Sequence, residues 1–175
     1  MTAKPRPHVG DRRGRTAAYA AAACAALFAA VNSFWAAGGT AGLHTLGGRI
    51  EEMARSGDRT VLLANVVAIV AKLAVALLAL ALVRPWGRRI PRRPLRVLAL
   101  SAAALLIAYG GLQTGAVLLV ATGLVTPDVP WTSTVLWWRL LLWEPWFLVW
   151  GVLLLIAARA ARADRHPDAV GAQRK

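Results

Sequence analysis

Residues 60–83 read TVLLANVVAIVAKLAVALLALALV and contain one charged side chain, Lys72. A helix needs about 20 predominantly apolar residues to cross a hydrocarbon core of about 30 Å. This segment meets that requirement and predicts a membrane-spanning helix. Working outward from it, three further apolar stretches are also long enough to span, at residues 16–37, 97–125 and 136–158. The sequence therefore predicts an all-α fold, a four-helix transmembrane bundle.

The predicted transmembrane domain covers residues 16–158, with basic tails at 1–15 and 159–175, the second of them expected to be disordered. The whole chain is 58% hydrophobic with a formal net charge of +13 and a mean hydropathy of +0.52. Soluble nucleic-acid-binding domains rarely combine so large a positive charge with so high a mean hydropathy, so the composition favours a membrane protein. The composition also excludes a disordered chain and a disulfide-rich secreted domain, since Cys24 is the single cysteine. No metal-ligand spacing or soluble-enzyme motif is found, so we expect no metal and no cofactor.

The basic residues fix the expected orientation. Sixteen of the 21 Lys and Arg residues fall in the two tails and in the loop between the second and third spans. Because basic residues accumulate on the cytoplasmic side of membrane proteins, this distribution predicts an antiparallel bundle with both termini in the cytoplasm.

The loop between the second and third spans carries six arginines between Arg84 and Arg96. Anionic lipid headgroups attract such a segment, and nucleic acid would do so as well. Trp86 is the one aromatic residue among these arginines, which disfavours nucleic-acid binding. The predicted partners are therefore the lipid bilayer and its anionic headgroups at this loop, with no nucleic acid; the oligomeric state stays open.

The first outer loop contains an amphipathic segment at residues 49–56. Ile50 and Met53 share one helical face, Glu51 and Glu52 lie on the other, and Gly57 is placed to end the helix. We expect a short helix that either lies on the outer surface or caps the mouth of the bundle.

Two charged residues lie deep in predicted spans, Lys72 in the second and Glu144 in the fourth. A central charge costs about 2.5–3.5 kcal/mol on insertion scales, so such residues are expected to find partners. At 1.5 Å per residue they lie about 18 Å and 12 Å below the outer edge, which predicts a Lys72–Glu144 ion pair. Pro145 removes a helix hydrogen bond, and its ring clashes with the carbonyl of Leu141. We therefore expect a helix kink beside the Glu144 carboxylate.

Other polar residues collect at similar depths, mainly in the outer half of the bundle. Together with the charged pair they form the candidate ligand-binding cluster: Asn32, Asn65, Lys72, Tyr109, Gln113, Arg139 and Glu144. One interpretation is a polar network that fixes helix register. The other is a small outward-facing cavity that holds an amphiphilic or lipid-like molecule.

Two alternatives stay open beside this leading hypothesis. A membrane-embedded lipid-modifying enzyme would use Glu144 and Lys72 as acid–base groups, though the sequence assigns no catalytic residue. An accessory subunit of a membrane complex would present a face of small residues such as Ala20, Cys24 and Phe28.

Several strings of this chain resemble a family of uncharacterised four-helix integral membrane proteins from high-GC bacteria, a domain of unknown function. They are WAAGGTAGLHTLGG at 35–48, ALVRPWGRR at 81–89, the triplet YGG at 109–111 and LLLWEPWFLVWG at 140–151. The resemblance covers about residues 18–158. It implies the four-helix architecture and a multi-pass location in the bacterial cytoplasmic membrane, and it implies no activity.

Overall fold

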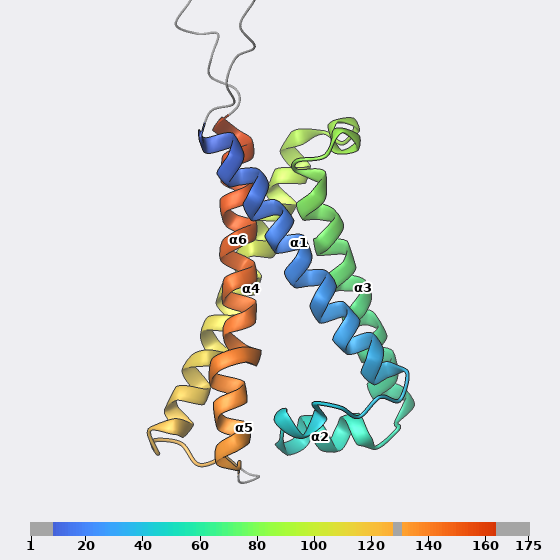
Figure 1. Cartoon of the computed structure of the whole chain (residues 1–175), viewed down its shortest axis with the longest axis vertical. Coiled ribbons are helices and arrows are strands. Elements are labelled where there is room, and N and C mark those ends of the chain that lie inside the picture. Colours follow the sequence, from blue (N-terminus) through green and yellow to red (C-terminus); the bar gives the residue numbers. More distant parts are fainter. Residues whose placement is uncertain (1–8, 128–130, 164–175) are drawn as a thin grey trace, which may run out of the picture.

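The computed structural model describes residues 9–127 and 131–163 of the chain, and these are almost entirely helical (Figure 1). Four helical segments are long and apolar enough to cross a membrane, as predicted. They are α1 (Val9–Ala36), α3 (Arg59–Ala81), α4 (Arg92–Ala121), and a final segment that runs through α5 (Ser133–Trp138), η3 (Arg139–Trp143) and α6 (Glu144–Ala163). The short elements η1 (Leu43–Thr45) and α2 (Gly48–Arg55) join α1 to α3, and η2 (Pro85–Arg89) joins α3 to α4.

The predicted amphipathic helix is confirmed as α2, within one residue of its expected bounds. Its N-cap, Gly47, has a φ of +60°, and Gly57 just beyond its end has a φ of +67°. α3 then begins at an Asp58 cap, whose Oδ1 accepts a hydrogen bond from the Thr60 backbone N–H at 2.6 Å. That hydrogen bond holds the pKa of Asp58 below its usual range.

The ends of the long helices differ from the predicted spans for local reasons. α4 begins at Arg92 rather than near 97, because Pro94 falls in its first turn, where a missing N–H is tolerated. It ends at Ala121 rather than 125, because Gly123 adopts a φ of +74° just past the helix. Of the predicted tails, residues 9–15 and 159–163 are helical, and the rest lie outside the described residues.

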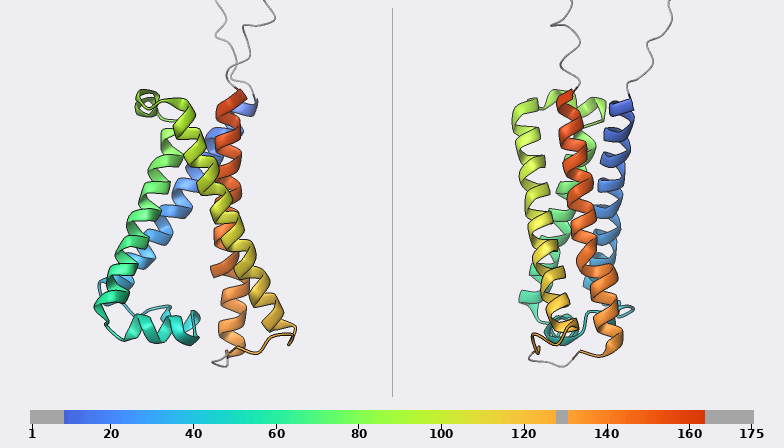
Figure 2. Two further views of the ribbon diagram at one scale, coloured as in Figure 1. Left: turned by 180° about the vertical axis from the view of Figure 1, so that it is seen from behind. Right: turned by 90° about the vertical axis from the view of Figure 1, so that its left-hand side faces the viewer.

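The helices form two antiparallel hairpins, α1 with α3 and α4 with the α5–α6 segment. Both described chain ends and η2 lie at one end of the molecule, and α2 and α5 lie at the other (Figure 1). The hairpins meet at the first end and separate toward the second (Figure 2). α1 packs against both α3 and α6, whereas α3 has few contacts with α4 or α6. We call the first end the basic end, for its arginines: Arg12, Arg13, Arg15, Arg84, Arg88, Arg89, Arg92, Arg93, Arg96 and Arg159.

Residue size explains why the hairpins meet at the basic end. Gly14 of α1 lies against Ala160 of α6, and Ala17 and Ala18 pack near Ala157. α4 and α6 approach closely at Gly110, where an added Cβ would lie 2.6 Å from the Leu148 backbone nitrogen. Small residues allow membrane helices to pack backbone against backbone. Toward the α2 end the facing residues are large, and the helices separate.

Candidate functional site

A buried ion pair lies within the last membrane-spanning segment. Arg139 donates to Glu144 Oε1 from Nη2 at 2.6 Å and from Nε at 3.0 Å. The two residues are 9% and 5% exposed. The Arg139 guanidinium also lies over the Trp131 ring, 4.4 Å from its centroid. The pair is therefore shielded from solvent, and the charges of its one acidic and one basic group neutralise each other.

A π-helical turn over Arg139–Trp143 makes this pairing possible. The Glu144 backbone N–H donates to the Arg139 carbonyl, five residues back. Side chains five residues apart in an α-helix are about 140° apart around the axis, and the wider turn reduces that angle. The same turn directly precedes Pro145, so the chain meets the proline with a π turn rather than with the simple kink that the sequence predicted.

The predicted Lys72–Glu144 ion pair is wrong. Glu144 is held by Arg139, and α3, which carries Lys72, packs on α1 and has few contacts with α6. The Lys72 Nζ lies instead 4.8 Å from the centroid of the Phe28 ring. Equal depth did not bring the two residues together, because their helices are not neighbours. The enzyme hypothesis thereby loses the acid–base pair on which it rested.

Lys72 has no acidic partner within 4 Å among the residues that the structure describes. A cation–π contact contributes about 0.5–2 kcal/mol. Placing a lysine at the centre of a membrane helix costs about 2.5–3.5 kcal/mol on insertion scales. The Phe28 contact therefore offsets only part of the cost of this charge.

Asn32 and Asn65 join α1 to α3. Asn32 Nδ2 donates to Asn65 Oδ1 at 2.8 Å, and Asn65 Nδ2 donates to the Asn32 carbonyl at 3.2 Å. The Asn32 Oδ1 is buried and accepts no hydrogen bond from the described part of the chain. Asn65 and Lys72 are seven residues apart on α3, so they share a face. The first hairpin thus presents an amide pair and a lysine.

The remaining predicted site residues, Tyr109 and Gln113, lie on α4. The Tyr109 ring packs edge-on against Phe147, with centroids 4.9 Å apart. Gln113 is one turn further along the helix and half-buried. The seven predicted residues therefore divide between the two hairpins: Asn32, Asn65 and Lys72 on the first, and Tyr109, Gln113, Arg139 and Glu144 on the second.

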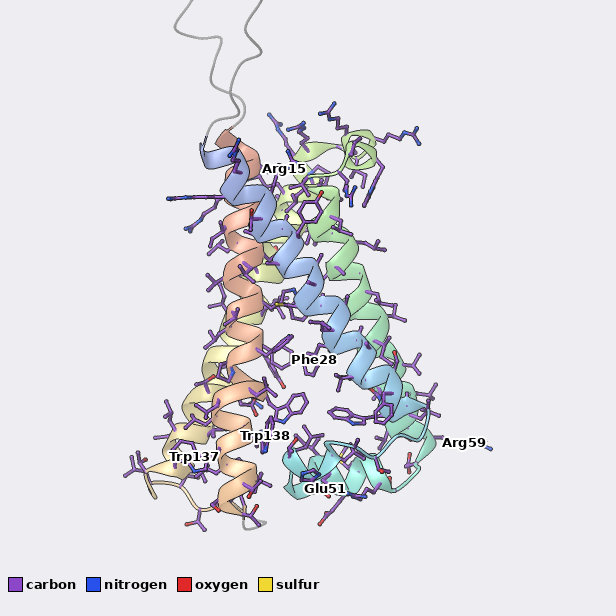
Figure 3. All side chains as sticks on the ribbon, viewed as in Figure 1. Arg15, Phe28, Glu51, Arg59, Trp137 and Trp138 are labelled. Carbon is purple, nitrogen blue, oxygen red and sulfur yellow. The ribbon has the colours of Figure 1, made fainter. Side chains whose placement is uncertain are left out.

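Aromatic side chains of the two hairpins contact one another between α1 and the last membrane-spanning segment. Phe28 projects from α1 into this space (Figure 3). Its ring centroid lies 5.9 Å from that of Trp143, 6.3 Å from Trp146 and 5.1 Å from Phe147. Trp35, nearer the α2 end, contacts Trp143 at 5.6 Å. We call these five residues the interhairpin cluster.

Sequence analysis did not identify the interhairpin cluster, although a signal was present. Trp143, Trp146, Phe147 and Trp150 follow the spacing i, i+3, i+4, i+7, which places them on one helical face. Trp150 is 2% exposed and belongs to the alanine-rich core, while the other three face the first hairpin. The stripe therefore runs from the packed core to the separated hairpins.

The loop element η1 closes over the α2 end of the cluster. The Trp143 indole N–H donates to Thr45 Oγ1 at 3.0 Å, and Thr45 is 5% exposed. A Cβ added to Gly47 would lie 2.5 Å from Val135 of α5, so the connection to α2 also packs against the second hairpin. η1 and the start of α2 thus bridge the two hairpins, as expected for a cap.

The small-residue face proposed for an accessory subunit is partly buried in the structure. Ala20 and Cys24 are partly buried, and the Trp146 indole N–H donates to the Cys24 carbonyl at 3.3 Å. Phe28 belongs to the interhairpin cluster. That face is therefore used in part for packing within the molecule.

No curated protein and no solved structure matches the chain. Residues 17–154 match the model of a family of proteins of unknown function, DUF3995. The match includes α3, α4, the interhairpin cluster and most of the first and last membrane-spanning segments. Because the match covers most of the chain, this multi-pass membrane protein belongs to the DUF3995 family.

Proposed function

We propose that this protein holds an amphiphilic molecule between its two helical hairpins, near the α2 end. The observation that carries the proposal is the contrast between the two ends of the molecule. Alanine and glycine pack the hairpins together at the basic end, whereas aromatic residues of the two hairpins face each other toward the α2 end. Binding sites for small molecules combine apolar and aromatic walls with a few polar groups in this way.

The polar groups beside the interhairpin cluster exceed what helix registration requires. A single amide pair such as Asn32–Asn65 is enough to fix the register of two helices. Here a lysine contacts Phe28 and a tyrosine contacts Phe147, and a buried ion pair lies in the same segment as Trp143 and Phe147. Ionisable residues inside membrane segments are costly and mark functional positions by default. An amphiphile would meet the aromatic rings with its chain and the charges with its polar group.

The binding experiment is a titration of the delipidated protein with single-chain amphiphiles, followed by native mass spectrometry. We expect one adduct per chain that survives removal of the detergent. Trp146→Ala should weaken that adduct because it removes a ring that packs on Phe28. The matched control is Trp137→Ala, since Trp137 is 58% exposed on α5 (Figure 3). Adducts without a defined stoichiometry, or equal losses in both variants, would contradict the proposal.

We infer that the basic end faces the cytoplasm of a bacterial cytoplasmic membrane. The arginines of η2 and of the neighbouring helix ends support this orientation, since basic residues are retained on the cytoplasmic side. With Cys24 replaced, a cysteine at Ser56 should react with an impermeant reagent from outside intact cells, and one at Arg88 should not. The reverse pattern would overturn the orientation.

We also propose that the Arg84–Arg96 segment lies on anionic lipid headgroups and binds no nucleic acid. Arg88, Arg89, Arg92 and Arg93 are exposed, and Trp86 is 44% exposed beside them. The protein should bind more tightly to vesicles containing phosphatidylglycerol than to neutral ones. Specific DNA or RNA binding at physiological salt would contradict this assignment.

A further inference from the structure

The charges inside the predicted membrane spans do not balance. Within residues 16–37, 60–83, 97–125 and 136–158, the charged side chains are Lys72, Arg139 and Glu144. The structure pairs Arg139 with Glu144 through two hydrogen bonds to one carboxylate oxygen. One positive charge, on Lys72, is left over inside the membrane.

Among the described residues, the surroundings of Lys72 supply aromatic surface but no anion. Its ammonium lies over Phe28, which itself packs on Trp143, Trp146 and Phe147. Lys72 is 13 residues from Arg59 and 9 residues from Ala81 along α3, about 20 Å and 14 Å from the two ends of that helix. It is therefore too deep to be compensated by the headgroup layer in the way that a lysine near a helix end would be.

The same part of the first hairpin carries an unsatisfied acceptor. Asn32 is one turn from Phe28 on α1, so the two share a face. The Asn32 Oδ1 is buried without a donor from the described residues. A cation and an unsatisfied acceptor thus lie on the first-hairpin side of the interhairpin cluster.

We infer that the bound amphiphile is anionic, and that its carboxylate or phosphate group pairs with Lys72 while its chain lies against the interhairpin cluster. This inference rests on the proposed function and specifies the chemistry of its ligand. The anion neutralises the remaining positive charge inside the bundle. A cationic amphiphile would place a second positive charge beside Lys72, and a neutral one would leave the first uncompensated.

The test compares amphiphiles that share one chain and differ in the polar group: oleate, oleoyl phosphate, monoolein and oleylamine. Affinities are measured on the full chain in a neutral detergent. We expect oleate or oleoyl phosphate to bind at least about tenfold more tightly than monoolein, and oleylamine to bind most weakly. The oleate and oleoyl phosphate arms separate a fatty-acid carboxylate from a phospholipid-type phosphate as the source of the anion.

Two variants assign the selectivity to Lys72. Lys72→Met should abolish the preference for the anion while monoolein binding persists, and Lys72→Arg should retain the preference. Arg59→Gln is the matched control, since it removes an exposed charge from the end of the same helix and should leave the preference intact. Thermal unfolding without ligand checks that Lys72→Met is folded; removal of an unpaired charge should not destabilise it.

The outcomes separate this inference from the proposed function. If no amphiphile of any charge binds between the hairpins, both fail. If monoolein binds as tightly as the anions, or if Lys72→Met keeps the anion preference, the amphiphile site stands and the role of Lys72 is refuted. Tightest binding of oleylamine would overturn the inference as well.

Discussion

The Arg139–Glu144 pair should behave as one energetic unit. Its side chains are 10% and 6% exposed, and both hydrogen bonds end on Glu144 Oε1. Removal of one partner, as in Arg139→Met or Glu144→Leu, leaves an uncompensated buried charge and should cost about 3–5 kcal/mol. For a chain of this size that loss corresponds to a decrease in Tm of about 6–20 °C.

The double variant Arg139→Met/Glu144→Leu should recover most of the loss, because two apolar residues of similar volume replace the pair. The measurement is a double-mutant cycle on thermal unfolding in detergent. The exposed pair Glu51–Arg55, at 2.9 Å on α2, is the control and should couple by only about 0.2–0.5 kcal/mol.

The same cycle distinguishes the two candidate partners of Glu144. Lys72→Met combined with Glu144→Leu should be additive within about 0.5 kcal/mol, because the two residues do not meet. Strict additivity of the Arg139 and Glu144 variants, or strong coupling of Lys72 with Glu144, would refute the site geometry.

Two further predictions concern the packing around the site. Gly110→Ala should lower the free energy of unfolding by about 1–3 kcal/mol, because the added methyl group would press on the Leu148 backbone. Gly115→Ala should cost nothing, since a Cβ added there would have no atom of another element within 4 Å. Thermal unfolding of both variants checks this contrast. Trp143→Phe removes the hydrogen bond to Thr45 and should raise amide hydrogen exchange in residues 43–56. The exposed Trp137→Phe should not raise it, and equal exchange in both variants would mean that this hydrogen bond does not hold the cap.

The long helices could be predicted from the sequence because each span needs only length and apolar composition. The short helix α2 could be predicted as well, since its amphipathic pattern and Gly57 are local features of the sequence. The separation of the two hairpins could not be predicted from the sequence. It depends on which alanines and tryptophans face each other across helices that are distant in sequence, such as Ala18 with Ala157 and Phe28 with Trp143.

Sequence reasoning did not predict how the polar residues of the candidate site pair. Depth along a helix is a one-dimensional estimate, and it placed Lys72 and Glu144 at similar levels. It contained no information on which helices are neighbours. The π turn before Pro145 changed the partner of Glu144 further, because it brought Arg139 onto the side of the carboxylate. α-Helical spacing alone would have kept these two residues apart.

Photo-crosslinking with a diazirine-bearing oleate tests the central claim most directly. The labelled peptides are mapped in membranes with and without excess unlabelled oleate. We predict saturable, competed labelling at Phe28 and Trp143, which face each other between the hairpins. Labelling at the exposed residues Leu63 and Val67 of α3 should rise with probe concentration without saturating. Labelling confined to such lipid-facing positions, with none competed at Phe28 or Trp143, would contradict an amphiphile site between the hairpins.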